Sequence, residues 1–456
     1  MNNTIIGLFI LGLSFDIYVI RKIFKLKELN VIDIYSLFIS LYFLIIPIRL
    51  AYDGASYRDI YITETLKDSQ YTLSVLCAFK LILLLLNIAL TRTRSKHLSF
   101  LKVTEQFKYF NKTIKTNPQI IYLYLVVFLF FLFSITNYSS LSADGYEMDR
   151  IWQYAVNVSF LERMIISMVS VGFPVFFILC IKYLMEIKIH KYRKIAKWNM
   201  FIAIICVLLG SRTQMFLIMV ISMIYLYSLY RDKITKKIVF YVAITLMTVP
   251  TIVFSTSQAF RITKQYVVEN HSSHSFTDVF SYFINLNDKE RKILLENAST
   301  STKGRSFNVY YAFYESCEKS YKHTDGAFFF DQLTCLIPII KPNPKFENFC
   351  AKLLEGGGDI GESSITVFNV DMELLGVLII TPIYYLILFW MICFMCTKAS
   401  VFFNCKELHF LMLALILSNC ISIEGVPSFR VLYNSTIITI VMFGIVFRLF
   451  NRKVIF

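Results

Sequence analysis

The sequence of residues 71–90 is YTLSVLCAFKLILLLLNIAL, and it decides the fold class of the chain. These residues include one charged side chain, Lys80. A helix of about 20 apolar residues crosses the hydrocarbon layer of a bilayer. No water is present there to satisfy the backbone, so a lone apolar segment of this length has to be helical. We therefore predict a transmembrane helix at residues 71–90.

Segments of the same kind recur along the whole chain. Of its 456 residues, 56% are hydrophobic and 17% are charged, whereas soluble domains average about 45–50% and about 25%. We expect an all-α polytopic membrane protein with about eleven transmembrane helices. The predicted spans are residues 5–20, 31–48, 71–90, 120–136, 164–184, 198–209, 213–230, 238–255, 374–396, 408–423 and 432–447.

Two of these spans need comment. The first has no preceding charge and no small-residue cleavage site, so we expect a retained helix and not a removed signal peptide. Residues 198–209 are short for a span. We nevertheless keep them separate from residues 213–230, because basic segments flank both ends of this pair.

Basic residues gather on one side of the predicted spans. We assign six segments to the inner side, residues 21–30, 91–119, 182–197, 231–237, 397–407 and 448–456. They hold 26 Lys and Arg against 5 Asp and Glu, whereas the opposite loops hold 19 against 22. Cytoplasmic loops are enriched in Lys and Arg, so we predict an outer N-terminus and an inner C-terminus. The net charge of +15 then reflects topology, and we expect no nucleic-acid partner.

Residues 256–363 form a long hydrophilic stretch on the predicted outer side. It separates an N-terminal bundle of eight spans (residues 1–255) from a C-terminal bundle of three (residues 364–456). We predict a flexible loop at residues 297–304, NASTSTKG, because the stretch is polar throughout. Aromatic and apolar residues at helical spacing predict a helix at residues 307–321, either lying on the membrane face or packed within the loop.

Most of the ten cysteines lie in or beside predicted spans, where they behave as small apolar residues. Cys317, Cys335 and Cys350 fall in the outer loop, and one pair of them is a candidate disulfide if that side is oxidising. The chain has no His-x-x-x-His pair. We expect no metal and no cofactor.

Arg212 is the first candidate for chemistry, in the sequence Gly-Ser-Arg-Thr at residues 210–213. It lies on the outer side, at the predicted start of a helix. A helix N-terminus together with a guanidinium forms an anion site. The alternative is an arginine that reaches the membrane surface and caps a turn.

A polar stripe is the second candidate. If residues 361–373 are helical, Glu362, Thr366, Asn369 and Glu373 share one face. Carboxylates facing lipid are costly, so the stripe should face protein or a wet cavity. The alternative is a helix end among the headgroups. Asp371 points the other way and is expected to be structural.

Other charged residues are weaker candidates. Arg430 lies in the last outer turn, as a ligand or an interfacial anchor, and Arg261, Arg305 and Lys341 lie in the long outer loop. Lys80 is expected to pair with Asp16 or Asp33 inside the bundle, in a structural role.

Four short motifs follow one another along the second half of the chain. They are Leu208-Leu-Gly-Ser-Arg-Thr213, Lys303-Gly-Arg305, Leu336-Ile-Pro-Ile-Ile-Lys-Pro342, and Gly361-Glu-Ser-Ser364 leading to Glu373-Leu-Leu-Gly376. In this order, with a long outer loop, the chain from Phe201 onward resembles the O-antigen polymerases (Wzy), also called oligosaccharide repeat unit polymerases. Two positions depart from that family's pattern. Ile339 follows Pro338 where an arginine is common, and Leu375 stands where a glycine is expected.

The resemblance implies a metal-independent glycosyltransferase of the bacterial inner membrane that acts in lipopolysaccharide O-antigen or capsule synthesis. Such enzymes transfer a growing glycan from undecaprenyl diphosphate onto another lipid-linked repeat unit. Glu362 and Arg212 are then the catalytic candidates, as base and as diphosphate ligand. The substrate-binding candidates are Arg430, Arg305, Arg261, Lys341, Asn369 and Glu373. The implied partners are the lipid-linked oligosaccharide, membrane lipid, a chain-length regulator and a flippase.

Two alternatives stay open. An O-antigen ligase has similar topology but a different acceptor. A flippase or another transporter of lipid-linked oligosaccharides belongs to a different class, and it would more often have short loops and buried charges along a central path. The long outer loop favours the polymerase.

Overall fold

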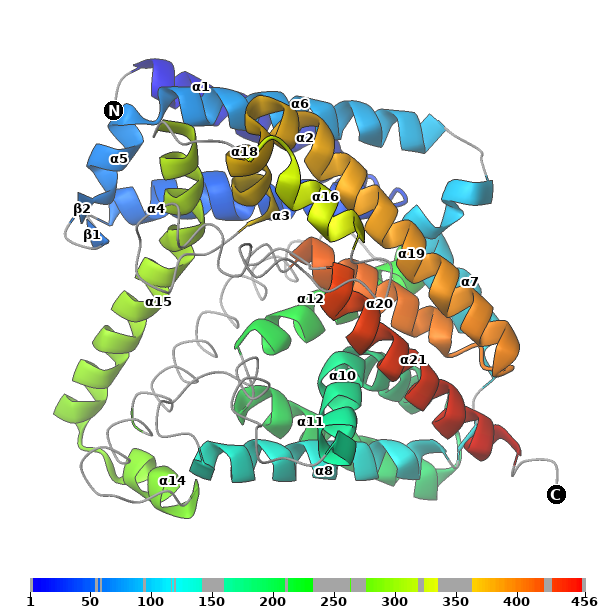
Figure 1. The fold of residues 1–456 in the computed structure, drawn as a ribbon. Coiled ribbons are helices and arrows are strands. Elements are labelled where there is room, and N and C mark those ends of the chain that lie inside the picture. Colours follow the sequence, from blue (N-terminus) through cyan, green and yellow to red (C-terminus); the bar gives the residue numbers. More distant parts are fainter. Residues whose placement is uncertain are drawn as a thin grey trace. The chain divides into compact units, whose positions relative to one another are not determined.

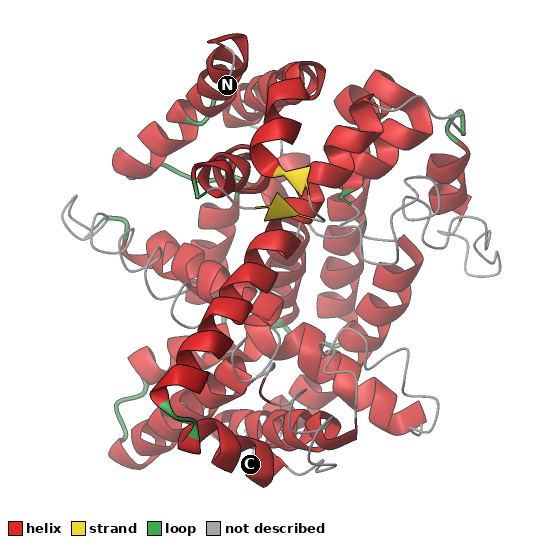
Figure 2. Cartoon of the chain, turned by 90° about the vertical axis from the view of Figure 1, so that its left-hand side faces the viewer, coloured by secondary structure: helices red, strands yellow, loops and turns green. Residues whose placement is uncertain are grey.

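Helices make up nearly all of the described part of the chain in the computed structural model (Figure 1, Figure 2). The structure describes residues 3–53, 56–57, 60–92, 96–115, 117–118, 120–141, 160–209, 212–232, 263, 276–318, 324–334, 363–421 and 429–452. Contacts group the chain into two units. The first comprises Met1–Gln106, Lys303–Met395 and Leu415–Ile437, and the second Phe107–Thr302, Cys396–Ala414 and Ile438–Phe456. This grouping differs from the division at residues 255 and 363, because segments far apart in sequence pack together.

The first unit contains the N-terminal helices and those around residue 370. Its elements are α1 (Asn3–Ser14), α2 (Ile17–Phe24), α3 (Val31–Ser40), a π-helical segment (Leu41–Ile45), α4 (Ile46–Tyr52), α5 (Ile62–Asp68), α6 (Gln70–Arg92), a 3₁₀ helix (Lys96–Leu101), α16 (Ala327–Thr334), α18 (Ser364–Leu375) and a second π-helical segment (Gly376–Ile380). A two-residue hairpin of β1 (Ser56–Tyr57) and β2 (Ile60–Tyr61) precedes α5.

The second unit contains α8 (Ile120–Leu141), α10 (Phe160–Glu186), α11 (His190–Leu209), α12 (Arg212–Tyr230) and α14 (Phe276–Asn285). Five more helices each begin in one unit and end in the other. They are α7 (Val103–Thr113), α15 (Asp288–Glu318), α19 (Thr381–Phe402), α20 (Leu408–Ile421) and α21 (Phe429–Arg452).

Apolar helices of membrane-crossing length confirm the predicted class of protein. Among the described residues, four helical segments are long and apolar enough to cross a bilayer, Asn3–Phe24, Val31–Tyr52, Gln70–Arg92 and Ser364–Phe402. Shorter apolar helices cover Ile120–Phe130, Phe216–Tyr230, Leu408–Ile421 and Thr436–Leu449. All of them overlap predicted spans. The predicted span at residues 238–255 lies outside the described residues.

Within the first unit, α1 and α2 run in the same direction as α6. The Cys77 thiol donates to the Leu8 carbonyl at 3.3 Å, and further along both chains Lys22 Nζ donates to Asn87 Oδ1 at 2.8 Å. Contacts that advance together along two helices define a parallel pair. The first and third predicted spans therefore share a direction.

The intervening helix α3 runs the opposite way. Its start contacts the end of α6, where Asn87 Nδ2 donates to Asp33. Its end contacts the middle of α6, where Lys80 Nζ donates to Ser40 Oγ. A capping box starts α3, because Asn30 and Asp33 each accept a hydrogen bond from the other's backbone N–H.

In the second unit, α8 and α11 are parallel and in constant register. Asn199 Nδ2 donates to the Ile121 carbonyl at 2.8 Å, and the Cys206 thiol donates to the Phe128 carbonyl at 3.3 Å. Both contacts join residues 78 positions apart. The helix α10 between them in sequence is antiparallel to α8, since Tyr183 stacks on Tyr124 while Phe173 lies against Phe128.

One local prediction in the long hydrophilic stretch is wrong, and the structure decides between the two alternatives of another. The predicted flexible loop at residues 297–304 is wrong, because these residues lie inside the 31-residue helix α15. Adding a residue to an existing helix is easy, and Ser, Thr and Asn cost at most about 0.7 kcal/mol each relative to Ala. Residues 307–318 of the predicted helix at 307–321 form the end of α15, and residues 319–321 lie outside the described residues. Phe307, Tyr310 and Phe313 are buried in protein, which decides for packing over a membrane-surface helix.

Candidate functional site

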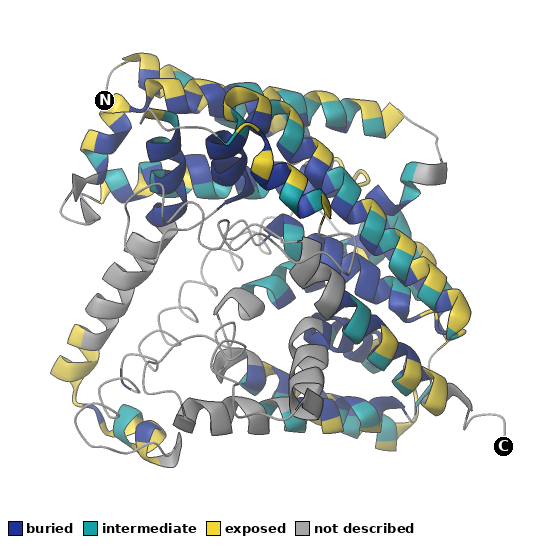
Figure 3. Cartoon of the chain, viewed as in Figure 1, coloured by how far each residue is buried: buried dark blue, intermediate teal, exposed yellow. Residues whose placement is uncertain are grey.

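The helix α18 contains the fourth sequence motif and forms the centre of the candidate site. Ser363 caps it, accepting a hydrogen bond from the Thr366 backbone at 3.2 Å. Residues 364–371 are all buried, and residues 373–375 are exposed (Figure 3). Ser364 Oγ also lies 2.9 Å from the hydroxyl of Tyr385 in α19. The first two turns are therefore held rigidly inside the first unit.

Asn369 joins α18 to the end of α15. Its amide nitrogen donates to the Ser316 carbonyl at 2.8 Å and to the Ser316 hydroxyl at 3.1 Å. Asn369 and Thr366 are buried, so this part of the polar stripe faces protein, as predicted. The amide nitrogen of Asn369 is thus engaged in holding α15 against α18.

Asp371 has the structural role predicted for it. Its carboxylate accepts hydrogen bonds from the backbone N–H groups of Phe328 at 3.1 Å and Phe329 at 3.0 Å, and from the Thr324 hydroxyl. These N–H groups lie in the first turn of α16, where they have no partner within the helix. Asp371 therefore fixes α16 to α18.

The helix breaks directly after Asp371. Met372 has φ −142° and ψ 22°, and Glu373 has φ 51° and ψ −139°. A non-glycine residue in that second conformation costs about 1–3 kcal/mol and persists only where its surroundings enforce it. Gly376 follows so closely that an added Cβ would lie 1.8 Å from the Phe368 carbonyl oxygen. The motif glycine is therefore required by this close approach of the chain to itself.

The break overturns the predicted polar face. We expected Glu362, Thr366, Asn369 and Glu373 to line one side of a continuous helix, but the chain leaves helical geometry before Glu373. Glu373 is exposed, in contrast to the buried Thr366 and Asn369. Glu362 lies outside the described residues, one position before the cap of α18.

The predicted cationic residues are distributed over both units. Arg212 is the first residue of α12 and belongs to the second unit. Arg305 lies within α15 and Arg430 near the start of α21, both in the first unit. Arg261 and Lys341 are outside the described residues.

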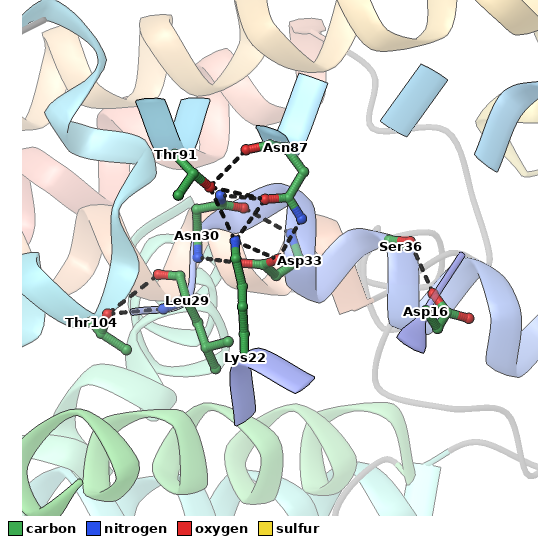
Figure 4. A network of polar contacts seen from close by, with 9 residues as sticks. All are labelled: Asp16, Lys22, Leu29, Asn30, Asp33, Ser36, Asn87, Thr91 and Thr104. Atoms are coloured by element: carbon green, nitrogen blue, oxygen red, sulfur yellow. Dashed lines mark hydrogen bonds and ion pairs between the residues drawn. The ribbon is translucent and has the colours of Figure 1, made fainter. Parts of the chain in front are cut away.

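Sequence reasoning missed a buried charged cluster around Lys22 (Figure 4). Lys22 was assigned to an inner loop, yet its ammonium donates to both carboxylate oxygens of Asp33 at 3.1 Å and to Asn87 at 2.8 Å. Asn30 Nδ2 also donates to Asn87, at 3.0 Å. Buried charges in membrane helices are costly unless paired, and this cluster pairs its two opposite charges.

A second buried ion pair lies farther along the same helices. Lys80 pairs with Asp16, one of its two predicted partners, and its ammonium also donates to the Ser36 hydroxyl at 2.9 Å. Figure 4 shows the companion hydrogen bond from Ser36 to Asp16. Asn87 follows Lys80 by two helical turns and therefore lies on the same face of α6, and this spacing is the signal in the sequence that could have indicated the cluster around Lys22.

We expect Lys80→Met to destabilise the protein by about 3–5 kcal/mol, because it leaves the Asp16 carboxylate buried without its cation. Adding Asp16→Asn should restore much of that loss. Unfolding in a denaturing-detergent titration followed by circular dichroism measures both effects. The control is Lys67→Met, since Lys67 is exposed on α5. Equal stability of the Lys80 and Lys67 variants would contradict a role for the pair.

The described cysteines give little support to thiol chemistry. Cys317, beside Asn369, is a free thiol, and burial raises its pKa to about 12, so it is protonated at neutral pH. Cys335 and Cys350 lie outside the described residues. Cys393 and Cys396 stand in a Cys-x-x-Cys spacing within α19, and neither forms a disulfide. Within the described ranges, no group of three or more His, Cys, Asp or Glu side chains has the arrangement of a metal site.

Comparison with known proteins yields no match to a family model, to a curated protein or to a solved structure.

Proposed function

We propose that this chain is an oligosaccharide repeat unit polymerase. It transfers a growing glycan from undecaprenyl diphosphate onto another lipid-linked repeat unit, in O-antigen or capsule synthesis. It works at the outer face of a bacterial inner membrane, with about eleven spans and residues 256–363 in the periplasm. The resemblance of its four ordered motifs to that family is the basis of the proposal.

One structural observation carries the proposal further, namely the broken helix at the fourth motif. A buried half-helix ends at Asp371, and an exposed carboxylate, Glu373, follows in a strained backbone conformation. Strain of this kind gathers at functional sites. Broken helices within membrane segments commonly mark substrate sites in membrane proteins. An exposed carboxylate on a rigid support suits a sugar hydroxyl as its ligand.

The proposed reaction requires a base and a group that stabilises the leaving diphosphate. The acceptor hydroxyl attacks the anomeric carbon of the donor, and the bond from that carbon to the diphosphate oxygen breaks. The electron pair leaves with the diphosphate, and the hydroxyl proton moves to a carboxylate, for which Glu362 is the candidate. Arg212 and the first N–H groups of α12 supply positive charge for the diphosphate.

The directions of the described helices support the proposed topology. The parallel pair of α1–α2 with α6, the antiparallel α3, and the parallel pair of α8 with α11 all agree with spans that alternate in direction. A flippase remains the alternative of a different class, and the buried charges around Lys22 and Lys80 are the feature that favours it.

Deleting the gene in its host tests the function. We expect glycan-bearing lipid at the cell surface to carry a single repeat, with no ladder of longer chains. Loss of a ligase would instead leave long chains on undecaprenyl diphosphate, and loss of a flippase would leave no repeat at the surface. The readout is gel electrophoresis of extracted glycolipid, with the restored gene as control. An unchanged ladder would refute the proposal.

A further inference from the structure

The start of α11 and the loop before it carry a dense group of cations. Lys188, His190, Lys191, Arg193, Lys194 and Lys197 form this basic surface, and all six are exposed. No acidic residue lies between Ile187 and Leu209. The closest preceding one, Glu186, is bound by Lys182 at 2.5 Å. None of the six forms an ion pair with the described part of the chain.

The register of α8 against α11 locates the edge of the apolar layer. The constant offset of 78 residues sets Ile120, the first residue of α8, level with Trp198 of α11. Both helices become apolar at this level, since α8 begins IIYLYLVV and α11 continues WNMFIAII. Two independent helices therefore give the same boundary. The eight residues of α11 before Trp198 extend about 12 Å beyond it.

One side of α11 is turned away from the protein from His190 to Cys206, the part of the helix whose side chains are described. Ala196, Asn199, Ala203 and Cys206 are buried at helical spacing and form the packed face. On the opposite side, Trp198, Phe201 and Ile204 are 55%, 54% and 48% exposed, as expected for side chains in contact with lipid. Lys191, Lys194 and Lys197 continue this outward side beyond the boundary.

We propose that the basic surface binds the headgroups of anionic phospholipids in the leaflet where α8 and α11 begin. The cations extend from the level where the apolar layer ends, and that is where lipid phosphates lie. Trp198 sits at the boundary itself, the position that tryptophan favours in membrane proteins. Clusters of four to eight Lys and Arg next to a membrane helix attract anionic lipid. This inference does not depend on the polymerase proposal.

The test compares two double variants of the full-length protein in detergent. Lys194→Gln with Lys197→Gln removes two charges from the basic surface. Lys289→Gln with Lys292→Gln removes two exposed lysines from α15 and serves as the matched control. Phosphatidylglycerol is titrated against each protein, with phosphatidylcholine in parallel, and native mass spectrometry counts the lipids retained.

We expect the Lys194 and Lys197 variant to lose affinity for phosphatidylglycerol by about tenfold or more, because each lysine near an anionic surface contributes about fivefold. The control variant should bind as the wild type does. High salt should reduce the difference, since exposed charges are screened. Three results would overturn the proposal, namely unchanged phosphatidylglycerol binding in the variant, an equal loss in the control, or equal retention of phosphatidylcholine by the wild type.

Discussion

Replacing Arg212 by lysine should reduce polymerisation by about 100-fold or more, and replacing it by alanine should abolish it. A guanidinium binds two phosphate oxygens at once, which the ammonium of lysine does not reproduce. Arg212 is also the first residue of α12, where free N–H groups and the helix dipole favour an anion. A purely interfacial arginine would instead accept lysine freely, because both side chains reach the membrane surface.

The length of the apolar part of α11 supports the role proposed for Arg212. The apolar part of α11 runs from Trp198 to Leu209, about 18 Å of helix, whereas the hydrocarbon layer is about 30 Å thick. The helix itself is longer than predicted, because it begins at His190 in the basic segment. In the proposed topology Trp198 lies at the inner boundary, and the end of α11 at Leu209 then lies below the outer surface.

The measurement is chain-length distribution from purified protein and lipid-linked repeat units, at matched protein concentration. Arg448→Ala is the control, since Arg448 is exposed on α21 and has no proposed role. Full activity of the lysine variant would remove Arg212 from the site.

Replacing Glu362, before α18, and replacing Glu373, after the break within α18, should change the kinetics in different ways. Glu362→Gln should reduce kcat by about 100-fold or more, because a general base contributes that much and glutamine cannot accept the proton. Glu373→Gln should mainly raise KM for the acceptor, since this exposed carboxylate is proposed to bind sugar hydroxyls. Protein abundance in the membrane should stay unchanged in both.

Initial rates over a range of acceptor concentrations separate kcat from KM for each variant. Glu64→Gln is the matched control, because Glu64 is exposed on α5. Wild-type kinetics in the Glu362 variant would assign the proton transfer elsewhere. A fall in kcat confined to the Glu373 variant would instead make Glu373 the base and leave Glu362 as the sugar ligand.

Much of the architecture followed from the sequence alone. Apolar runs such as residues 71–90 predicted membrane-length helices because a bilayer leaves the backbone no other partners. The single charge in that run predicted that Lys80 pairs with Asp16 or Asp33, because a buried charge needs a partner, and the structure shows the pair with Asp16. The structural role of Asp371 was predicted as well, from its position off the polar face.

Only the tertiary structure decided the remaining features, because they depend on contacts distant in sequence. The break at Glu373 depends on the close approach of Gly376 to Phe368 and on the hold of Asp371 on α16, neither of which helical periodicity can show. Lys22 belonged to a basic segment by local composition, whereas Asp33 and Asn87, contributed by α3 and α6, make its burial possible. Periodicity reports which face of a helix is apolar, whereas the neighbouring helices determine where that helix ends and which charges it can bury.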